Sequence, residues 1–257
     1  PRIEDAANTE TAVPILFDLV EGWARQGAKI SLAGPTKANK TSFLIHFGLC
    51  IATGTPFLGR KVRQGRVLYL NLELSSCSFW ERQESILQAL GVELAPGMFQ
   101  AWHLRGYGVT VESLAERLEQ VCKPGDYALL VFDSFYKLLG NRNENAANEM
   151  ADLFNRLEVI SHRLGAAYLL AHHFGKGNAS ARVTLDRARG SCVLASDGDC
   201  ILTLTPHAEQ GCYSLEATCR DHPPVSPQIL RWEFPLFVKA SEVEDAAPED
   251  ASGEGAE

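Results

Sequence analysis

The chain has 257 residues, of which 46% are hydrophobic and 22% charged, a composition typical of a soluble globular protein. No apolar run reaches the roughly 18 residues that a transmembrane helix needs, so the sequence excludes a membrane protein built of helices. The formal net charge is −8, but the segment 241–257 holds seven acidic residues and no basic one, so the remaining chain is nearly neutral and indicates no class of partner.

The first half of the chain alternates short apolar runs with longer helical patterns. Residues 1–13 are polar and lack the features of a signal peptide, so we expect a flexible N-terminal segment. A leading helix is then predicted over residues 13–27. Three strands and two helices follow in alternation, and they are predicted over residues 29–34, 40–54, 66–73, 79–91 and 99–106.

The alternation continues in the second half and changes character in the last third. Helices are predicted over 109–123 and 144–165, and nearly all-apolar runs within 124–134 and 166–173 predict strands that are covered on both faces. Three further strands are expected over residues 199–206, 212–219 and 228–235. The pattern predicts an α/β domain over residues 14–240, in which a mainly parallel twisted sheet is flanked by helices and extended by C-terminal antiparallel strands.

The acidic segment 241–257 is poor in apolar residues, and a disordered tail is therefore predicted there. Its role remains open between a solvated tail without a specific partner and a segment that binds a protein partner or mimics DNA. The seven cysteines are odd in number and form no C-x-x-C pair. This pattern favours reduced core thiols in a cytoplasmic protein over a zinc site or a disulfide framework.

Residues 34–41, GPTKANKT, form the clearest motif in the chain. They match the phosphate-binding pattern G-x-x-x-x-G-K-[ST], except that Asn39 stands at the second glycine. The predicted strand before this loop and the helix after it are the context that the pattern requires. Asparagine enters the left-handed backbone region more readily than other non-glycine residues, so the substitution is mild. The motif alone leaves a working nucleotide site, a decayed site and a chance match open.

In a working loop of this kind, backbone N–H groups and the helix N-terminus cradle the phosphate oxygens of ATP. Lys40 would reach the β- and γ-phosphates, and the hydroxyl of Thr41 would hold Mg²⁺. Lys37 adds a second positive charge near the phosphates. The predicted nucleotide site comprises the loop, the first helical residues and an acidic residue after a later strand: Gly34, Pro35, Thr36, Lys37, Ala38, Asn39, Lys40, Thr41, Ser42 and Asp133.

Polar residues end three of the predicted apolar strands. Asp133 ends LLVFD and could hold Mg²⁺ together with Thr41, while Glu73 ends VLYLNLE and could orient or deprotonate an attacking water. His172 follows another apolar run, where a polar side chain can touch the γ-phosphate. An ordinary solvated strand end remains the alternative for Glu73, and Asp133 alone is a weak signal because strands often end in Asp. A metal site at His172 and His173 is disfavoured, because adjacent residues of a strand point to opposite faces.

Taken in order, the stretches GPTKANKT, VLYLNLE, ALLVFDS, LLAHHFGKG and DRARGS resemble those of RecA-like P-loop ATPases of the RepA/DnaB/KaiC group. The likeness covers roughly residues 14–235. Within that group, the chain looks most similar to RepA-type hexameric replicative helicases and to the RepA-like ATPases of plasmids, phages and mobile elements. The resemblance implies a RecA-like fold, with ATP and Mg²⁺ as cofactors.

The resemblance also implies a role for each motif residue. Lys40 and Thr41 would belong to the Walker A motif and Asp133 to the Walker B motif. Glu73 would be the catalytic glutamate and His172 a sensor of the γ-phosphate. In this family ATP lies between the subunits of a ring, here expected to be a hexamer, and a neighbouring subunit supplies an arginine finger. Arg220 is the expected finger, with Arg187 and Arg189 as alternatives.

The resemblance implies that a loop after residues 166–173 contacts single-stranded DNA, and a basic, flexible loop suits phosphate contacts that ignore sequence. Its cationic residues are Lys176, Arg182, Arg187 and Arg189. An ordinary solvated loop remains the alternative. The loop after Asp133, which contains Tyr136, Lys137 and Arg142, is a second candidate. The implied function is ATP hydrolysis by a helicase or related DNA motor. The alternative is a KaiC-like nucleotide-dependent switch or scaffold that binds a protein partner and turns over slowly.

Overall fold

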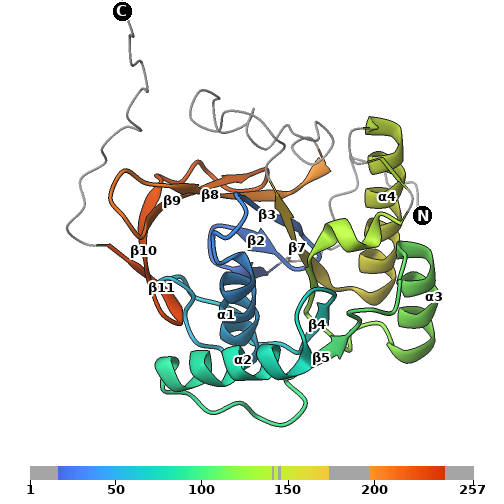
Figure 1. The fold of residues 1–257 in the computed structure, drawn as a ribbon. Helices are drawn as coiled ribbons and strands as arrows, with labels where there is room; N and C mark the ends of the chain where they lie inside the picture. Colours follow the sequence, from blue (N-terminus) through green and yellow to red (C-terminus); the bar gives the residue numbers. More distant parts are fainter. Residues whose placement is uncertain (1–16, 141, 144–145, 174–196, 241–257) are drawn as a thin grey trace, which may run out of the picture.

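The computed structural model describes residues 17–140, 142–143, 146–173 and 197–240, which fold around a nine-stranded sheet of order β11-β10-β9-β8-β3-β7-β6-β4-β5 (Figure 1). The strands are β3 (Lys29–Gly34), β4 (Val67–Asn71), β5 (Phe99–His103), β6 (Leu129–Asp133), β7 (Ala167–His173), β8 (Cys200–Pro206), β9 (Cys212–Cys219), β10 (Gln228–Glu233) and β11 (Leu236–Lys239). Strands β3 to β8 pair in parallel, and β9 to β11 pair antiparallel. The predicted α/β class is therefore confirmed.

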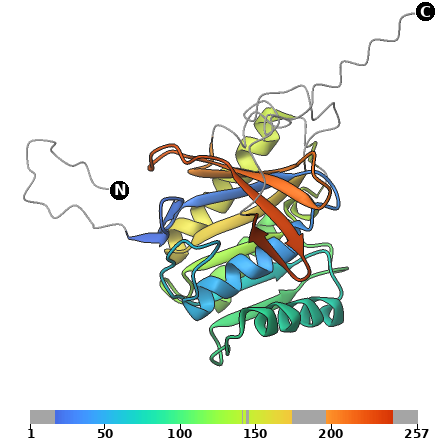
Figure 2. The ribbon, with the colours of Figure 1, turned by 90° about the vertical axis from the view of Figure 1, so that its left-hand side faces the viewer.

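Two pairs of helices cover the two faces of the parallel part (Figures 1 and 2). The apolar cluster on one face includes side chains of α1 (Lys40–Thr53) and α2 (Ser76–Leu90), and the cluster on the other face includes those of α3 (Val111–Val121) and α4 (Ala147–Leu164). Because both faces are covered, strands such as β4 and β6 are buried along their whole length. The antiparallel strands reach α1, where the rings of Phe43 and Phe237 lie 5.9 Å apart.

The predicted helix over residues 13–27 is wrong for residues 17–27, the part of it that the structure describes. A small antiparallel pair, β1 (Asp18–Val20) and β2 (Ala24–Arg25), occupies this segment. Gly22 adopts a φ of 69°, which makes a turn and interrupts a helix. The apolar residues Leu19, Val20, Trp23 and Ala24 gain burial from this short hairpin, since all of them are buried.

Several boundaries also differ from the predictions, and the differences affect the site. The strand predicted over 66–73 ends at Asn71, so Glu73 lies in the loop that follows β4. Helix α2 begins at Ser76, where the Ser75 hydroxyl accepts a hydrogen bond from the backbone of Ser78. Strand β11 was not predicted. No described helix is both long and apolar enough to span a membrane. The predicted flexible segment and acidic tail lie outside the described residues.

Candidate active site

The phosphate-binding loop lies between the central strand β3 and the start of α1. Gly34 ends β3 close to β8, and a Cβ atom there would lie 3.1 Å from the carbonyl oxygen of Leu204. Lys37 and Asn39 both adopt left-handed conformations, with φ values of 68° and 52°. The expectation that Asn39 takes the left-handed conformation usually given to glycine is confirmed, and Asn39 directly precedes the first residue of α1.

Lys40 folds back over this loop. Its ammonium donates hydrogen bonds to the carbonyl oxygens of Gly34, at 2.9 Å, and Pro35, at 2.7 Å. Burial lowers the pKa of Lys40 to about 8, although the carboxylates of Asp133 and Glu73 act in the opposite direction. A desolvated cation is thus fixed over the loop that leads into the N-terminus of α1, and both the cation and the helix N-terminus favour an anionic ligand.

Asp133 is buried at the end of β6, and its carboxylate accepts a hydrogen bond from the Tyr69 hydroxyl at 2.7 Å. Burial raises the pKa of Asp133 to about 6, while hydrogen bonds from Tyr69 and Thr41 oppose the rise. The structure therefore brings Thr41 and Asp133, the two predicted metal residues, into contact. A hydroxyl and a carboxylate suit Mg²⁺, which keeps several waters and takes its other ligands from phosphate oxygens.

Glu73 is held at the same edge of the sheet by two neighbouring polar residues. The Ser134 hydroxyl donates a hydrogen bond to the Glu73 carboxylate at 2.9 Å. The Asn71 side chain is fully buried and accepts hydrogen bonds from the backbone N–H groups of Glu73, at 3.3 Å, and Leu74, at 2.9 Å. Asn71 thereby shapes the loop that presents Glu73, and the register pairs Asn71 with Asp133.

These side chains surround a cavity of about 350 Å³. Four further residues complete it and were not predicted from the sequence. They are Leu74 after β4, Arg82 of α2, Ser134 after β6 and Ala171 of β7. The predicted residues that line the cavity are those of the range 36–41, Glu73 and Asp133. Arg82 was detectable in principle, because it lies three residues after Phe79 and four before Ile86, the two buried residues of α2.

The remaining predicted residues lie elsewhere. His172 follows Ala171 but is not among the residues that line the cavity, and its ring lies 6.3 Å from that of Phe135. Arg220 follows β9 and forms an ion pair with Asp199 at 3.4 Å, beside the start of β8. The cationic residues Lys176, Arg182, Arg187 and Arg189 lie outside the described residues.

A second hollow of about 670 Å³ adjoins the cavity at Glu73. The loop after β5 lines it with Arg105, and the segment after β6 lines it with Tyr136 and Lys137. Lys137 lies over the ring of Tyr136, with its nitrogen 4.9 Å from the ring centre. Glu73 thus borders two hollows, one lined by the phosphate-binding loop and one that contains cations and an aromatic ring.

The raised pKa of Asp133 predicts a pH dependence of stability. Between the unfolded pKa of 3.8 and the folded value of about 6, the folded protein binds more protons than the unfolded chain. The stabilisation is therefore complete below pH 3.8 and is lost as the pH rises through 6. Its size is about 3 kcal/mol of unfolding free energy. We expect this slope to be smaller in Asp133→Asn, as measured by urea unfolding without nucleotide from pH 4 to 7.

Asp221→Asn, which changes an exposed carboxylate, is the matched control and should keep the wild-type slope. An unchanged slope in Asp133→Asn would show that the buried carboxyl does not titrate in this range.

Comparison with known proteins agrees with this geometry. The AAA domain family matches residues 2–179, more than half of the chain. The fold is similar to the solved structure of a DnaB-like replicative helicase studied with its primase interactions, with 14% identity and a TM-score of 0.66. The match covers 89% of this chain and 65% of that chain, so this chain spans less than two thirds of the helicase. No curated protein matches. The mainly parallel sheet flanked by helices has a RecA-like α/β fold, and by its family match the chain belongs to the AAA domain family.

Proposed function

We propose that the protein hydrolyses ATP with Mg²⁺, assembles into a hexameric ring and acts on single-stranded DNA as a RepA-like replicative helicase or related motor. One observation carries the proposal: Lys40, Glu73 and Asp133 meet around one cavity, although they come from three separate elements. The parallel sheet explains the convergence, because the carboxyl ends of β3, β4 and β6 share an edge.

The chemistry would be in-line attack by water on the γ-phosphate. The Glu73 carboxylate would accept the proton of the attacking water, and the Ser134 hydroxyl, which donates to Glu73, would fix its orientation. Lys40 and Arg82, which both line the cavity, would neutralise the phosphate charge. Mg²⁺, when bound at Thr41 and Asp133, would stabilise charge on the phosphate oxygens. His172 is proposed to respond to the phosphates from the neighbouring strand.

A role for single-stranded DNA is supported by the second hollow. Arg105 and Lys137 supply positive charge there, and Tyr136 supplies a ring on which a base can stack. Because Glu73 borders this hollow as well as the cavity, DNA bound there could alter the position of the catalytic carboxylate. Lys176, Arg182, Arg187 and Arg189 are proposed to contribute further phosphate contacts.

Steady-state ATP turnover with and without single-stranded DNA tests this proposal. We expect DNA to stimulate turnover, and Lys137→Ala to weaken DNA binding and to reduce the slope of log affinity against log salt by about 1. Lys123→Ala, which removes an exposed lysine outside both hollows, is the matched control. ATP turnover that no oligonucleotide changes would instead favour a KaiC-like switch with a protein partner.

A further inference from the structure

Two cysteines face each other across β8 and β9, away from the candidate active site. Cys200 opens β8, Cys219 closes β9, and the register pairs them directly with their sulfur atoms 3.0 Å apart. The backbone N–H of Arg220 donates a hydrogen bond to the carbonyl oxygen of Asp199 at 2.8 Å. Because this neighbouring pair of residues is hydrogen-bonded, Cys200 and Cys219 occupy a non-hydrogen-bonded position between the two strands. Their Cα atoms are then about 4.5 Å apart, within the range that a disulfide spans.

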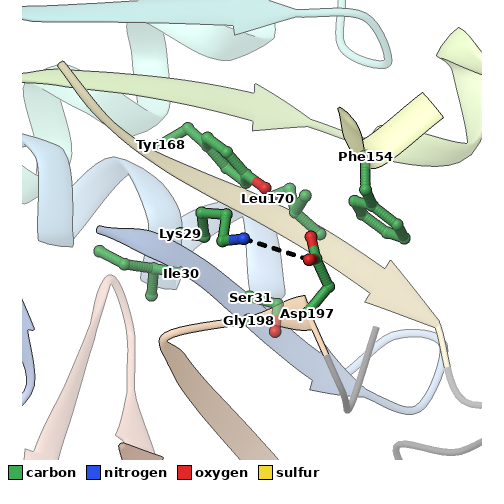
Figure 3. A pocket seen from close by; sticks show the side chains of 8 residues that line it. All are labelled: Lys29, Ile30, Ser31, Phe154, Tyr168, Leu170, Asp197 and Gly198. Carbon is green, nitrogen blue, oxygen red and sulfur yellow. Dashed lines mark hydrogen bonds and ion pairs between the residues drawn. The ribbon is translucent and has the colours of Figure 1, made fainter. Parts of the chain in front are cut away.

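The backbone around Cys200 is anchored to the central strand. The Lys29 ammonium pairs with Asp197 at 3.1 Å, as Figure 3 shows, and with Glu158 at 3.3 Å. The backbone N–H of Lys29 donates to the Asp199 carboxylate at 2.9 Å, and the N–H of Asp199 donates to the Lys29 carbonyl at 2.9 Å. These contacts hold Cys200 opposite Cys219, so no large rearrangement is needed to join the sulfur atoms.

The two thiols also differ in exposure and in the direction in which their pKa values are shifted. The hydrogen-bond contact with the Cys200 thiol lowers the pKa of Cys219, and the nearby Arg60 guanidinium lowers it further against the opposing effect of burial. The hydrogen bond and burial raise the pKa of Cys200. Arg60 is fixed nearby, because it donates to the Glu21 carbonyl at 3.0 Å and lies 4.6 Å from the Trp23 ring centre. Cys219 is partly exposed, and Cys200 is fully buried.

We propose that Cys200 and Cys219 are a redox-sensitive site that hydrogen peroxide converts reversibly into a cross-strand disulfide. The Cys219 thiolate attacks one peroxide oxygen, the O–O bond breaks, and a sulfenic acid forms as hydroxide leaves and takes up a proton to become water. The Cys200 sulfur then attacks the Cys219 sulfur, the S–O bond breaks, and a second water leaves with the thiol proton. Two thiols thus lose two electrons and two protons, and one peroxide becomes two waters.

The other described cysteines lack this arrangement. Burial raises the pKa of Cys50 and Cys122, and a hydrogen bond to Glu81 raises the pKa of the exposed Cys77. Among the described residues, no further pair of thiols is in contact. The described cysteines are free, in agreement with the reduced thiols expected from the sequence. The proposal adds that one pair can be oxidised, and spacing along the chain did not show that residues 200 and 219 are cross-strand neighbours.

The test treats the full chain with hydrogen peroxide, blocks remaining thiols with iodoacetamide and maps linked peptides by mass spectrometry. We expect one intrachain link between Cys200 and Cys219, a loss of two hydrogens in mass, and reversal by dithiothreitol. The melting temperature should rise by roughly 5–10 °C on oxidation and fall back on reduction. Cys77→Ser, which removes the exposed thiol, is the matched control and should form the same link.

Cys200→Ser separates the two steps of the proposal. In this variant, oxidation of Cys219 should stop at the sulfenic acid, which dimedone traps, and no disulfide should form. Cys219→Ser should yield neither product at these positions. A link that joins either cysteine to Cys192 or to a second chain would overturn the assignment, and so would the absence of any link while Cys219 is oxidised. These readouts do not depend on ATP turnover, so the proposal is tested independently of the proposed function.

Discussion

Glu73→Gln is expected to reduce ATP turnover by about 10²- to 10⁴-fold, the usual contribution of a general base, while ATP still binds. The amide keeps the size of the side chain and can still accept the hydrogen bond from Ser134, but it cannot take a proton from water. Lys40, the proposed phosphate contact, and Thr41, the proposed Mg²⁺ ligand, remain in place. Turnover is measured by phosphate release, and ATP binding by titration of a fluorescent ATP analogue.

The matched control is Glu93→Gln, which makes the same change at an exposed residue of the loop after α2. It should leave both turnover and affinity unchanged. Lys40→Ala gives the complementary result, because it removes the cation at the phosphates and should lower ATP affinity as well as turnover. Turnover that survives in Glu73→Gln would assign the role of base to another group. Loss of ATP binding in Glu73→Gln would show that Glu73 supports the cavity and does not act in the chemistry.

Most of the fold could be predicted from the sequence, because periodicity and apolar runs are local signals. The strands β4 and β6 are buried on both faces and therefore appear as nearly continuous apolar runs. The segment 17–27 could not be predicted in this way. Its apolar residues fit a helix as well as a hairpin, and the choice depends on tertiary contacts such as the pairing of Val20 with Val62.

In the candidate site, too, residues of a local motif were predictable, whereas residues placed there by tertiary structure were not. The loop around Lys40, with Thr41 and Asp133, has a recognisable spacing at the end of a strand, and the structure brings these residues together. Ser134 and Arg82 were missed: neither belongs to a motif, and although the spacing of Arg82 placed it on the buried side of α2, only the folded chain brings that helix to the cavity. In the sequence, Asn39 departs from the phosphate-binding pattern and leaves open whether the loop binds nucleotide. As a left-handed residue before α1, it is compatible with a working loop.

Arg220 lies far from the cavity of its own chain, so its proposed role as a finger requires a neighbouring subunit. The Arg220 side chain forms an ion pair with Asp199. The backbone N–H of Asp199 donates a hydrogen bond to the carbonyl oxygen of Lys29 at the start of β3. The phosphate-binding loop follows the other end of β3, roughly 17 Å away at the usual rise per residue of a strand. Arg220 therefore lies at the opposite edge of the sheet from the cavity of its own chain. Its side chain is 55% exposed, so a ring neighbour could be reached.

Arg220→Ala is accordingly expected to lower turnover by about 10³- to 10⁵-fold if Arg220 is the finger. Mixing it with Lys40→Ala should restore activity, because some interfaces then pair an intact loop with an intact finger. In a random ring with head-to-tail contacts, roughly one quarter of the interfaces are of this kind. Arg231→Ala, which removes another ion-paired arginine of the antiparallel strands, is the matched control and should retain turnover. Mixed rings are confirmed by native mass spectrometry. If such rings stay inactive, Arg220 is not the finger, and the same mixing experiment with Arg187→Ala and Arg189→Ala identifies the residue that is.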